Sequence, residues 1–156
     1  MSPSDIQARP ATAEDEAFLR GLFFTIRAPE FKMAGLQGEP LETLLAQQYV
    51  AMRTHYGRVY PDAVYEIFEF EGKPIGYQAT IDDETLHLID IALIPEFRSQ
   101  GIGTDRMKRL QDLAQNSQKP LTLTVEKFNP ALHLYERLGF VTYDEKDIYQ
   151  RMRWTP

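Results

Sequence analysis

Residues 85–117 read TLHLIDIALIPEFRSQGIGTDRMKRLQDLAQNS, and this stretch decides the fold. Its first part, TLHLIDIALI, is nearly all apolar in its second half, which is typical of a strand covered on both faces. A loop with two glycines follows, and Met107, Leu110 and Leu113 then keep a three-residue spacing that predicts a helix. A strand, a glycine loop and a helix in succession indicate an α/β protein.

The loop Arg98-Ser-Gln-Gly101-Ile-Gly103 suits a phosphate or pyrophosphate. Its two glycines let the backbone approach a ligand closely and turn N–H groups toward it, and the next helix adds the positive end of its dipole. Arg98, Arg106 and Lys108 add positive charge, although they also fit a solvated helix face. Position 106 is arginine and no Gly-Lys-Ser/Thr follows, so the loop is neither a Rossmann fingerprint nor a Walker loop.

The rest of the chain predicts further helices and strands around this unit. Thr12 and Asp15 form a capping-box pattern before apolar residues at helical spacing, and Glu71–Pro74 is the turn of a hairpin. The stretch 28–40 is rich in turn-forming residues. The expected elements are a short strand and a helix over 6–27, a helix over 41–56, a hairpin over 64–81, a strand over 120–128, a helix over 129–140 and a closing hairpin over 140–154. We therefore expect a single α/β domain, 1–156, with a mixed sheet of about seven strands and four helices.

Composition excludes several classes of protein. The chain of 156 residues carries a net charge of −6 and no cysteine, and its histidines are only His55, His87 and His133. A disulfide scaffold and cysteine-bound metals are excluded, and no metal site is expected. The negative net charge disfavours a nucleic-acid partner. No apolar run reaches the roughly 20 residues of a membrane span, and the first residues lack a signal-peptide pattern. A cytoplasmic location is expected.

Two motifs resemble the GNAT superfamily of N-acetyltransferases. Arg98-x-x-Gly101-x-Gly103 is similar to its acyl-CoA-binding motif, and the stretch 129–140, NPALHLYERLGF, is similar to its second motif. The resemblance covers roughly residues 6–153 and is sharpest over 86–140. One difference is the asparagine, because Asn129 lies two residues before Ala131 and not the more common three.

The resemblance implies that acetyl-CoA is the acyl donor. Two neighbouring strands, 85–94 and 120–127, would splay apart around the pantetheine, with backbone groups of Ile91 and Leu93 bonded to it. The Ile91 N–H would polarise the thioester carbonyl, and N–H groups from Ser99 to Thr104 would hold the pyrophosphate. The cofactor-binding residues implied are Ile91, Ala92, Leu93, Arg98, Ser99, Gln100, Gly101, Ile102, Gly103, Thr104, Asn129 and Tyr135.

The resemblance also implies catalytic residues. Tyr135 corresponds to the general acid that protonates the leaving thiolate, the alternative being an aromatic residue that only packs. Strand alternation puts His87, Ile89, Ile91 and Leu93 on one face and Leu88, Asp90 and Ala92 on the other. His87 lies eleven residues before Arg98, where the resemblance implies a catalytic Glu or His, so His87 is the expected base. Glu126 is the second candidate, and a partly buried histidine without a catalytic role is the alternative for His87.

The acceptor is not named by the sequence. Tyr49, Tyr56, Tyr60 and Tyr65, with Arg53 and Arg58 between them, suit an amine that also has a carboxylate or a ring, or they only cover the sheet. The acidic composition favours a small cationic amine. A protein lysine or N-terminal acetyltransferase and a non-catalytic acyl-CoA-binding module are the alternatives, and a homodimer is left open.

Overall fold

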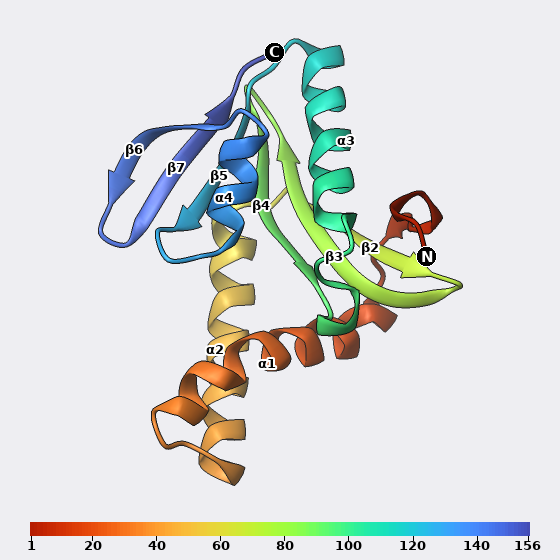
Figure 1. Ribbon diagram of the computed structural model, residues 1–156. Coiled ribbons are helices and arrows are strands. Elements are labelled where there is room, and N and C mark those ends of the chain that lie inside the picture. The colour runs from red at the N-terminus through yellow and green to blue at the C-terminus, as the bar shows by residue number, and fades with distance from the viewer.

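The computed structural model describes residues 1–156 and contains one seven-stranded sheet in the order β1-β2-β3-β4-β5-β7-β6 (Figure 1). Only β4 and β5 run parallel to each other. The strands are β1 (Gln7–Pro10), β2 (Val64–Phe70), β3 (Lys73–Asp82), β4 (Leu86–Leu93), β5 (Leu121–Glu126), β6 (Val141–Lys146) and β7 (Tyr149–Trp154). The helices are α1 (Glu16–Met33), α2 (Gly38–Val59), α3 (Ile102–Ser117) and α4 (Ala131–Arg137). The predicted element order, mixed sheet and four helices are confirmed.

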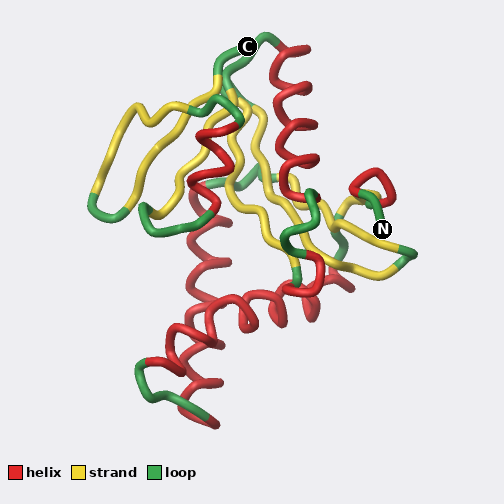
Figure 2. Tube along the Cα trace, viewed as in Figure 1, coloured by secondary structure: helices red, strands yellow, loops and turns green.

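Helices cover both faces of the sheet (Figure 2). Under α3 and α4, Met107 and Leu110 pack with Leu88 and Leu123 in the larger core cluster. On the opposite face, residues of α1 such as Leu19 pack against β2 and β3. Because successive strand residues point to opposite faces, each central strand supplies both cores. None of the helices has the combination of length and hydropathy that a membrane span requires.

The beginning of α1 is as predicted, but its end is not. The Asp15 carboxylate accepts the Thr12 N–H at 2.7 Å and pairs with Arg9 at 2.8 Å, so the capping box forms. The helix then continues to Met33 with Pro29 inside it, where the sequence predicted a turn over 28–40. Proline removes one helical N–H and its ring crowds the preceding turn, yet the helix continues past it for four residues.

A β-bulge in β4 changes which of its residues share a face. Ala79 of β3 lies opposite Asp90, and Thr80 lies opposite Leu88, so Ile89 is an extra residue in β4. A bulge interrupts the alternation of side chains. Asp90 therefore lies on the same face as His87.

The expected grouping of His87 with Ile91 and Leu93 is consequently wrong. Ile91 packs with the core under α3 and α4, as Leu88 does, whereas Ala92 packs against the α1 core. His87 and Asp90 both lie on the face toward α1, because the extra residue at the bulge reverses which face each later residue of β4 points to. Alternation counted along the sequence cannot register the extra residue.

The parallel strands β4 and β5 separate just after they begin. They pair at Leu86–Leu121, His87–Thr122 and Leu88–Leu123, and no pairing is present beyond Leu88. Both strands continue, to Leu93 and Glu126. The backbone edges facing one another beyond that point are free, so the splayed strands predicted from the sequence are present, and the splay starts at the bulge.

Candidate active site

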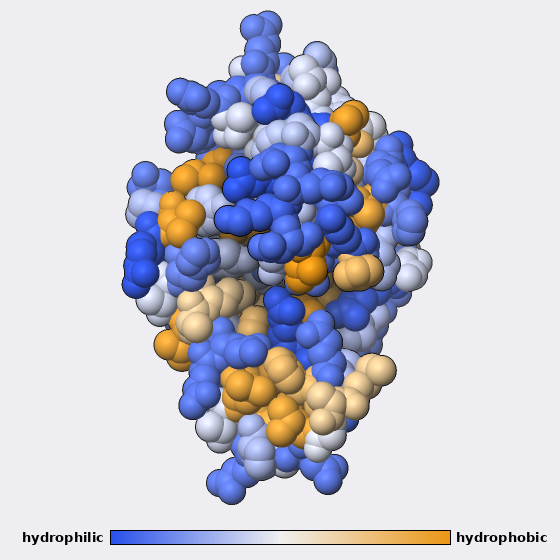
Figure 3. Space-filling model, turned by 90° about the vertical axis from the view of Figure 1, so that its left-hand side faces the viewer, coloured by the Kyte–Doolittle hydropathy of each residue, from blue (hydrophilic) through white to orange (hydrophobic).

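One large cavity occupies the gap between the splayed strands. Its volume is about 990 Å³, and it is lined by residues from both faces of the sheet. We call one part the α1–α2 half, lined by α1 from Leu19 to Glu30, by α2 from Gln48 to Tyr56, and by Tyr65, Tyr77 and Asp90 of the sheet. The α3–α4 half is lined by the first turns of α3 and by α4 and the loop before it. Figure 3 shows apolar side chains gathered on the lower part of one face, at the level of the lower ends of α1 and α2.

The glycine loop ends in a row of free backbone donors. None of the six N–H groups from Ser99 to Thr104 donates a hydrogen bond within the chain. Ser99 and Gly101 have φ angles of 61° and 85°, so two residues of the loop are in the left-handed region. Free N–H groups in such a loop at a helix N-terminus are an anion-binding arrangement.

Predicted cofactor residues divide into those that line the cavity and those beside it. Ile91, Ala92, Leu93, Arg98, Ile102, Gly103, Asn129 and Tyr135 line it. Ser99, Gln100, Gly101 and Thr104 do not; they lie in the loop and first turn at its border. The first set can therefore contact a ligand in the cavity directly, and the second borders the cavity with free backbone N–H groups.

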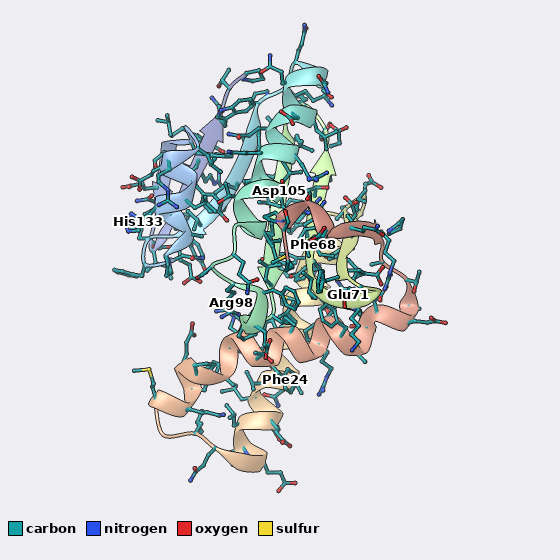
Figure 4. All side chains as sticks on the ribbon, turned by 45° about the vertical axis from the view of Figure 1, so that its right-hand side comes forward. Phe24, Phe68, Glu71, Arg98, Asp105 and His133 are labelled. Carbon is teal, nitrogen blue, oxygen red and sulfur yellow. The ribbon has the colours of Figure 1, made fainter.

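Several of these groups already have partners. Arg98, in the loop below α3 (Figure 4), donates from Nε to the Leu93 carbonyl at 3.1 Å, so one lone pair of this carbonyl is already used. Asn129 accepts the Ala131 N–H at 2.9 Å through Oδ1, just before α4. Gln100 donates to the Glu96 carbonyl at 2.8 Å. The Arg98 guanidinium and the Asn129 amide keep other donors free.

The basic patch predicted around α3 is mostly used within the fold. Arg106 is buried, donates to the Ile6 carbonyl at 2.6 Å and lies 4.9 Å from the Phe68 ring. Its Nε has no hydrogen-bond partner, although the residue lines the cavity. Arg109 pairs with Asp105 at 2.8 Å. Arg98 and Arg106 are therefore the arginines that bring positive charge to the α3–α4 half.

Tyr135 lines the α3–α4 half and is 6% exposed. Its ring packs 5.8 Å from that of Phe140, while its hydroxyl makes no hydrogen bond within the chain. Burial, together with the charge of Asp90, raises the pKa of Tyr135 to about 12. The phenol therefore keeps its proton at neutral pH and has it available for donation.

Asp90 lies on the other side of the same gap. Its carboxylate accepts a hydrogen bond from the Tyr77 hydroxyl. Burial raises the pKa of the Asp90 carboxyl above its ordinary value, although Tyr77, the Ile91 N–H and the charge of Arg27 each lower it. A carboxylate with a raised pKa accepts a proton more readily than an exposed one.

His87 is not among the residues that line the cavity. Its Nδ1 lies 2.8 Å from the Thr122 hydroxyl, and its ring stacks on that of Tyr60 at 5.7 Å. Burial and the charge of Arg151 lower its pKa below 6.5. The residue sits where β4 and β5 are still paired, before the gap opens.

The other residues considered from the sequence lie in different places. Glu126 lines the cavity at the end of β5, whereas Tyr60 does not line it. His55 and His133 are exposed, and Figure 4 shows His133 on α4, away from α3. No group of three or more histidine, cysteine, aspartate or glutamate residues is placed to hold a metal ion.

Tyrosines and arginines surround the α1–α2 half. Tyr49 donates to Glu16 and lies 5.5 Å from the Phe23 ring. Tyr65 stacks on Tyr77 with centroids 6.4 Å apart, and the Arg53 guanidinium lies 4.7 Å from the Tyr65 ring. Of the tyrosines considered from the sequence, Tyr49, Tyr56 and Tyr65 therefore line the cavity.

Asp90, Tyr77 and Arg27 are site residues that sequence reasoning missed. Asp90 is the one charged residue between Leu86 and Leu93, and that isolation in an apolar strand was a usable signal. Tyr77 and Arg27 carry no such signal, because only the packing of α1 and β3 around β4 brings them to the cavity.

Comparison with known families agrees with this geometry. The model of the acetyltransferase (GNAT) family matches residues 14–140, which include the glycine loop, the splayed strands and Tyr135. The chain therefore belongs to the acetyltransferase (GNAT) family. Membership makes it an acetyl-CoA-dependent N-acetyltransferase, as the resemblance of its motifs implied.

Solved structures share the fold at low sequence identity. PaiA N-acetyltransferase from Thermoplasma acidophilum, in complex with coenzyme A, has a TM-score of 0.71 and 18% identity over 97% of this chain and 99% of that one. Spermidine N-acetyltransferase from Vibrio cholerae, with CoA and spermine, has a TM-score of 0.66 and 20% identity over 97% and 96%. A GNAT family acetyltransferase from Elizabethkingia anophelis, with acetyl-CoA bound, has a TM-score of 0.63 and 19% identity over 98% and 99%. No curated protein sequence matches the chain.

Proposed function

We propose that this acetyltransferase transfers the acetyl group of acetyl-CoA to a small primary amine by direct attack, with Tyr135 as general acid and Asp90 as base. The observation that carries the proposal is one cavity in which the unbonded Tyr135 hydroxyl and the Asp90 carboxylate line the gap between β4 and β5. An acid on the α3–α4 side and a base on the α1–α2 side are what this reaction requires.

Acetyl-CoA occupies the α3–α4 half in this proposal. The free N–H groups from Ser99 to Thr104 bind the pyrophosphate, with charge from Arg98. The pantetheine enters the gap along the free edges of β4 and β5. The bound coenzyme A of the Thermoplasma acidophilum structure and the acetyl-CoA of the Elizabethkingia anophelis structure, which share this fold, support the choice of ligand.

The chemical step follows from these positions. An alkylammonium with a pKa near 10 gives a proton to Asp90. Its nitrogen then attacks the thioester carbonyl carbon, a C–N bond forms and the C–S bond breaks. The Tyr135 hydroxyl protonates the departing thiolate and regains a proton from solvent, while the second proton of the nitrogen and the proton held by Asp90 pass to solvent. One proton is released overall, and the products are an acetamide and coenzyme A thiol.

His87 has no part in this proposal, because it lies outside the cavity and its ring is held by Thr122 and Tyr60. Glu126 lines the cavity and is the alternative base. Exchange of each acid for its amide, Asp90→Asn and Glu126→Gln, separates the two, since only loss of the true base removes the acidic limb of the kcat/KM profile.

A panel of small amines with acetyl-CoA, read by release of free thiol, tests the function. Thiol release that depends on the amine and exceeds hydrolysis supports it. Binding of acetyl-CoA in isothermal titration without turnover of any acceptor would instead favour an acyl-CoA-binding module. Acetylation of lysines or amino termini in a proteome, seen by mass spectrometry with no small-amine turnover, would favour a protein-modifying enzyme.

A further inference from the structure

We infer that the amine acceptor also carries a carboxylate on an apolar or aromatic body, so that it is an amino acid or a close relative and not a polyamine. The inference rests on the proposed function, because it names the second substrate of the same cavity. Three features of the α1–α2 half carry it: the number of free acids, the arginines, and the aromatic walls.

The first feature is that two carboxylates of the cavity have no ion-pair partner, Asp90 in the α1–α2 half and Glu126 at the end of β5. Asp90 has no ion-pair partner, whereas Glu30 lies 3.9 Å from Arg27. Glu16, outside the cavity lining, is bonded to Tyr49 and lies 3.4 Å from Arg53. Beside Asp90, the proposed base, one ammonium group is therefore matched, and the other acids nearby, Glu30 and Glu16, already have arginine partners. A polyamine brings further ammonium groups that would meet arginines, and like charges repel.

The second feature is that two arginines keep hydrogen-bond donors available. Arg53 uses one nitrogen toward Glu16, and Arg27 makes only a 3.9 Å contact with Glu30, whose side chain is 65% exposed. A guanidinium has five N–H donors and binds carboxylates in a bidentate fashion. An anionic group on the acceptor would satisfy donors that the chain leaves free.

The third feature is the aromatic wall between these charges. Phe23 lies against Tyr49, and the rings of Tyr65 and Tyr77 are within 10° of parallel. Such surfaces bind apolar or aromatic groups through area and ring stacking. An aliphatic or aromatic side chain fits here better than the hydrated chain of a polyamine.

Amine and carboxylate sites lie within reach of one small molecule. Arg27 and Arg53 line the α1–α2 half together with Asp90. All of these groups line the same cavity. An amino acid, in which one molecule carries both charges, matches this distribution with its ammonium toward Asp90 and its carboxylate toward the arginines.

The test uses acceptor pairs that differ only in the carboxylate. We would compare kcat/KM for phenylalanine with phenethylamine, for leucine with 3-methylbutylamine, and for spermidine, with acetyl-CoA as donor. We expect each amino acid to exceed its partner at least about 10-fold, the scale of one charge-assisted hydrogen bond, and spermidine to be the poorest acceptor.

Arginine variants show whether the preference comes from this half. In Arg27→Gln and Arg53→Gln the ratio within each pair should fall toward one, whereas exposed Arg58→Gln, outside the cavity on α2, should keep the ratio. Because the ratio is compared between the parent and each variant, the lower amine pKa of an amino acid affects both ratios equally and does not change the result. If a glutamine variant does not fold, the lysine variant keeps the charge but loses the bidentate geometry, and a smaller fall is expected.

The outcomes separate the two proposals. Turnover in which amines without a carboxylate or spermidine are preferred, or in which the arginine variants keep the ratio, overturns the inference and leaves the acetyltransferase assignment intact. Thiol release from no amine at all overturns the proposed function instead.

Discussion

The Tyr77 hydroxyl of β3 donates a hydrogen bond to the Asp90 carboxylate of β4, and the bulge at Ile89 makes this contact available. Without the extra residue, Asp90 would point toward α3 and β3 would offer it no tyrosine. The contact holds a carboxylate of raised pKa at the gap between the splayed strands, where the proposed reaction needs a base.

Asp90→Asn tests this base. We expect kcat/KM to fall by about 10²-fold or more, because a positioned proton acceptor contributes on that scale, while acetyl-CoA affinity stays the same. The raised pKa of Asp90 places the acidic limb of the profile above that of an ordinary aspartate, and activity rises with pH as the carboxyl ionises. Steady-state kinetics across pH measure both effects.

The control for Asp90→Asn is Asp83→Asn, in the exposed turn before β4 and outside the cavity. It should leave kcat/KM and its pH profile unchanged. A retained acidic limb in Asp90→Asn, with its loss in Glu126→Gln, would transfer the role to Glu126.

Tyr135→Phe removes one unbonded hydroxyl and almost no volume. We expect kcat to fall about 10²-fold with little change in the affinity for acetyl-CoA, since the variant loses a proton donor and keeps the packing against Phe140. Because the pKa of Tyr135 is about 12, the parent enzyme should show no basic limb from this residue between pH 7 and about 10.

The matched control variant is Tyr143→Phe, at an exposed position on β6, which should leave kcat and acetyl-CoA affinity unchanged. Activity of Tyr135→Phe within twofold of the parent would mean that the residue only packs.

Gly101→Val tests the pyrophosphate loop. Its φ of 85° lies in the left-handed region, where a β-branched residue is strained, so the row of free N–H groups would be disturbed. We expect acetyl-CoA to bind at least about 10-fold more weakly by isothermal titration, the scale of one charge-assisted hydrogen bond, with the circular dichroism spectrum unchanged. Gly57→Ala in α2, whose added methyl would meet nothing within 4 Å, should bind as the parent does.

His87→Gln should behave differently from the active-site variants. The residue lies outside the cavity and its Nδ1 bonds to Thr122. We therefore expect kcat/KM of the variant to stay within about threefold of the parent and to keep the acidic limb, whereas loss of a general base would lower it by about 10²-fold. Loss of that limb would restore His87 as the base.

The same variant should alter stability at acid pH. Burial lowers the pKa of His87, so below pH 6.5 the unfolded chain binds a proton that the folded chain does not, and the free energy of unfolding falls with falling pH. Removing His87 should reduce that fall, by up to about 1.4 kcal/mol per pH unit. Urea unfolding at pH 7.5 and 5.5 measures it, and equal slopes in both proteins would contradict the lowered pKa.

Local patterns in the sequence determined much of this protein. The turn at Glu71–Pro74, the capping box of Thr12 and Asp15, and the glycine loop before α3 are all set by neighbouring residues, so element order, fold and the motif around Tyr135 could be predicted. These features depend on φ angles, caps and spacing that a short segment contains in itself.

Contacts between distant segments decided the rest. The helix α1, which contacts α2, continues beyond Pro29, and the bulge at Ile89 exists because β4 pairs with β3 in a register that no local pattern records. That single extra residue moves Asp90 into the cavity with Tyr77, while His87 stays outside it. Strand alternation is local, whereas register and bulges are set by the partner strand, so only the tertiary structure brings Asp90, the proposed base, into the cavity.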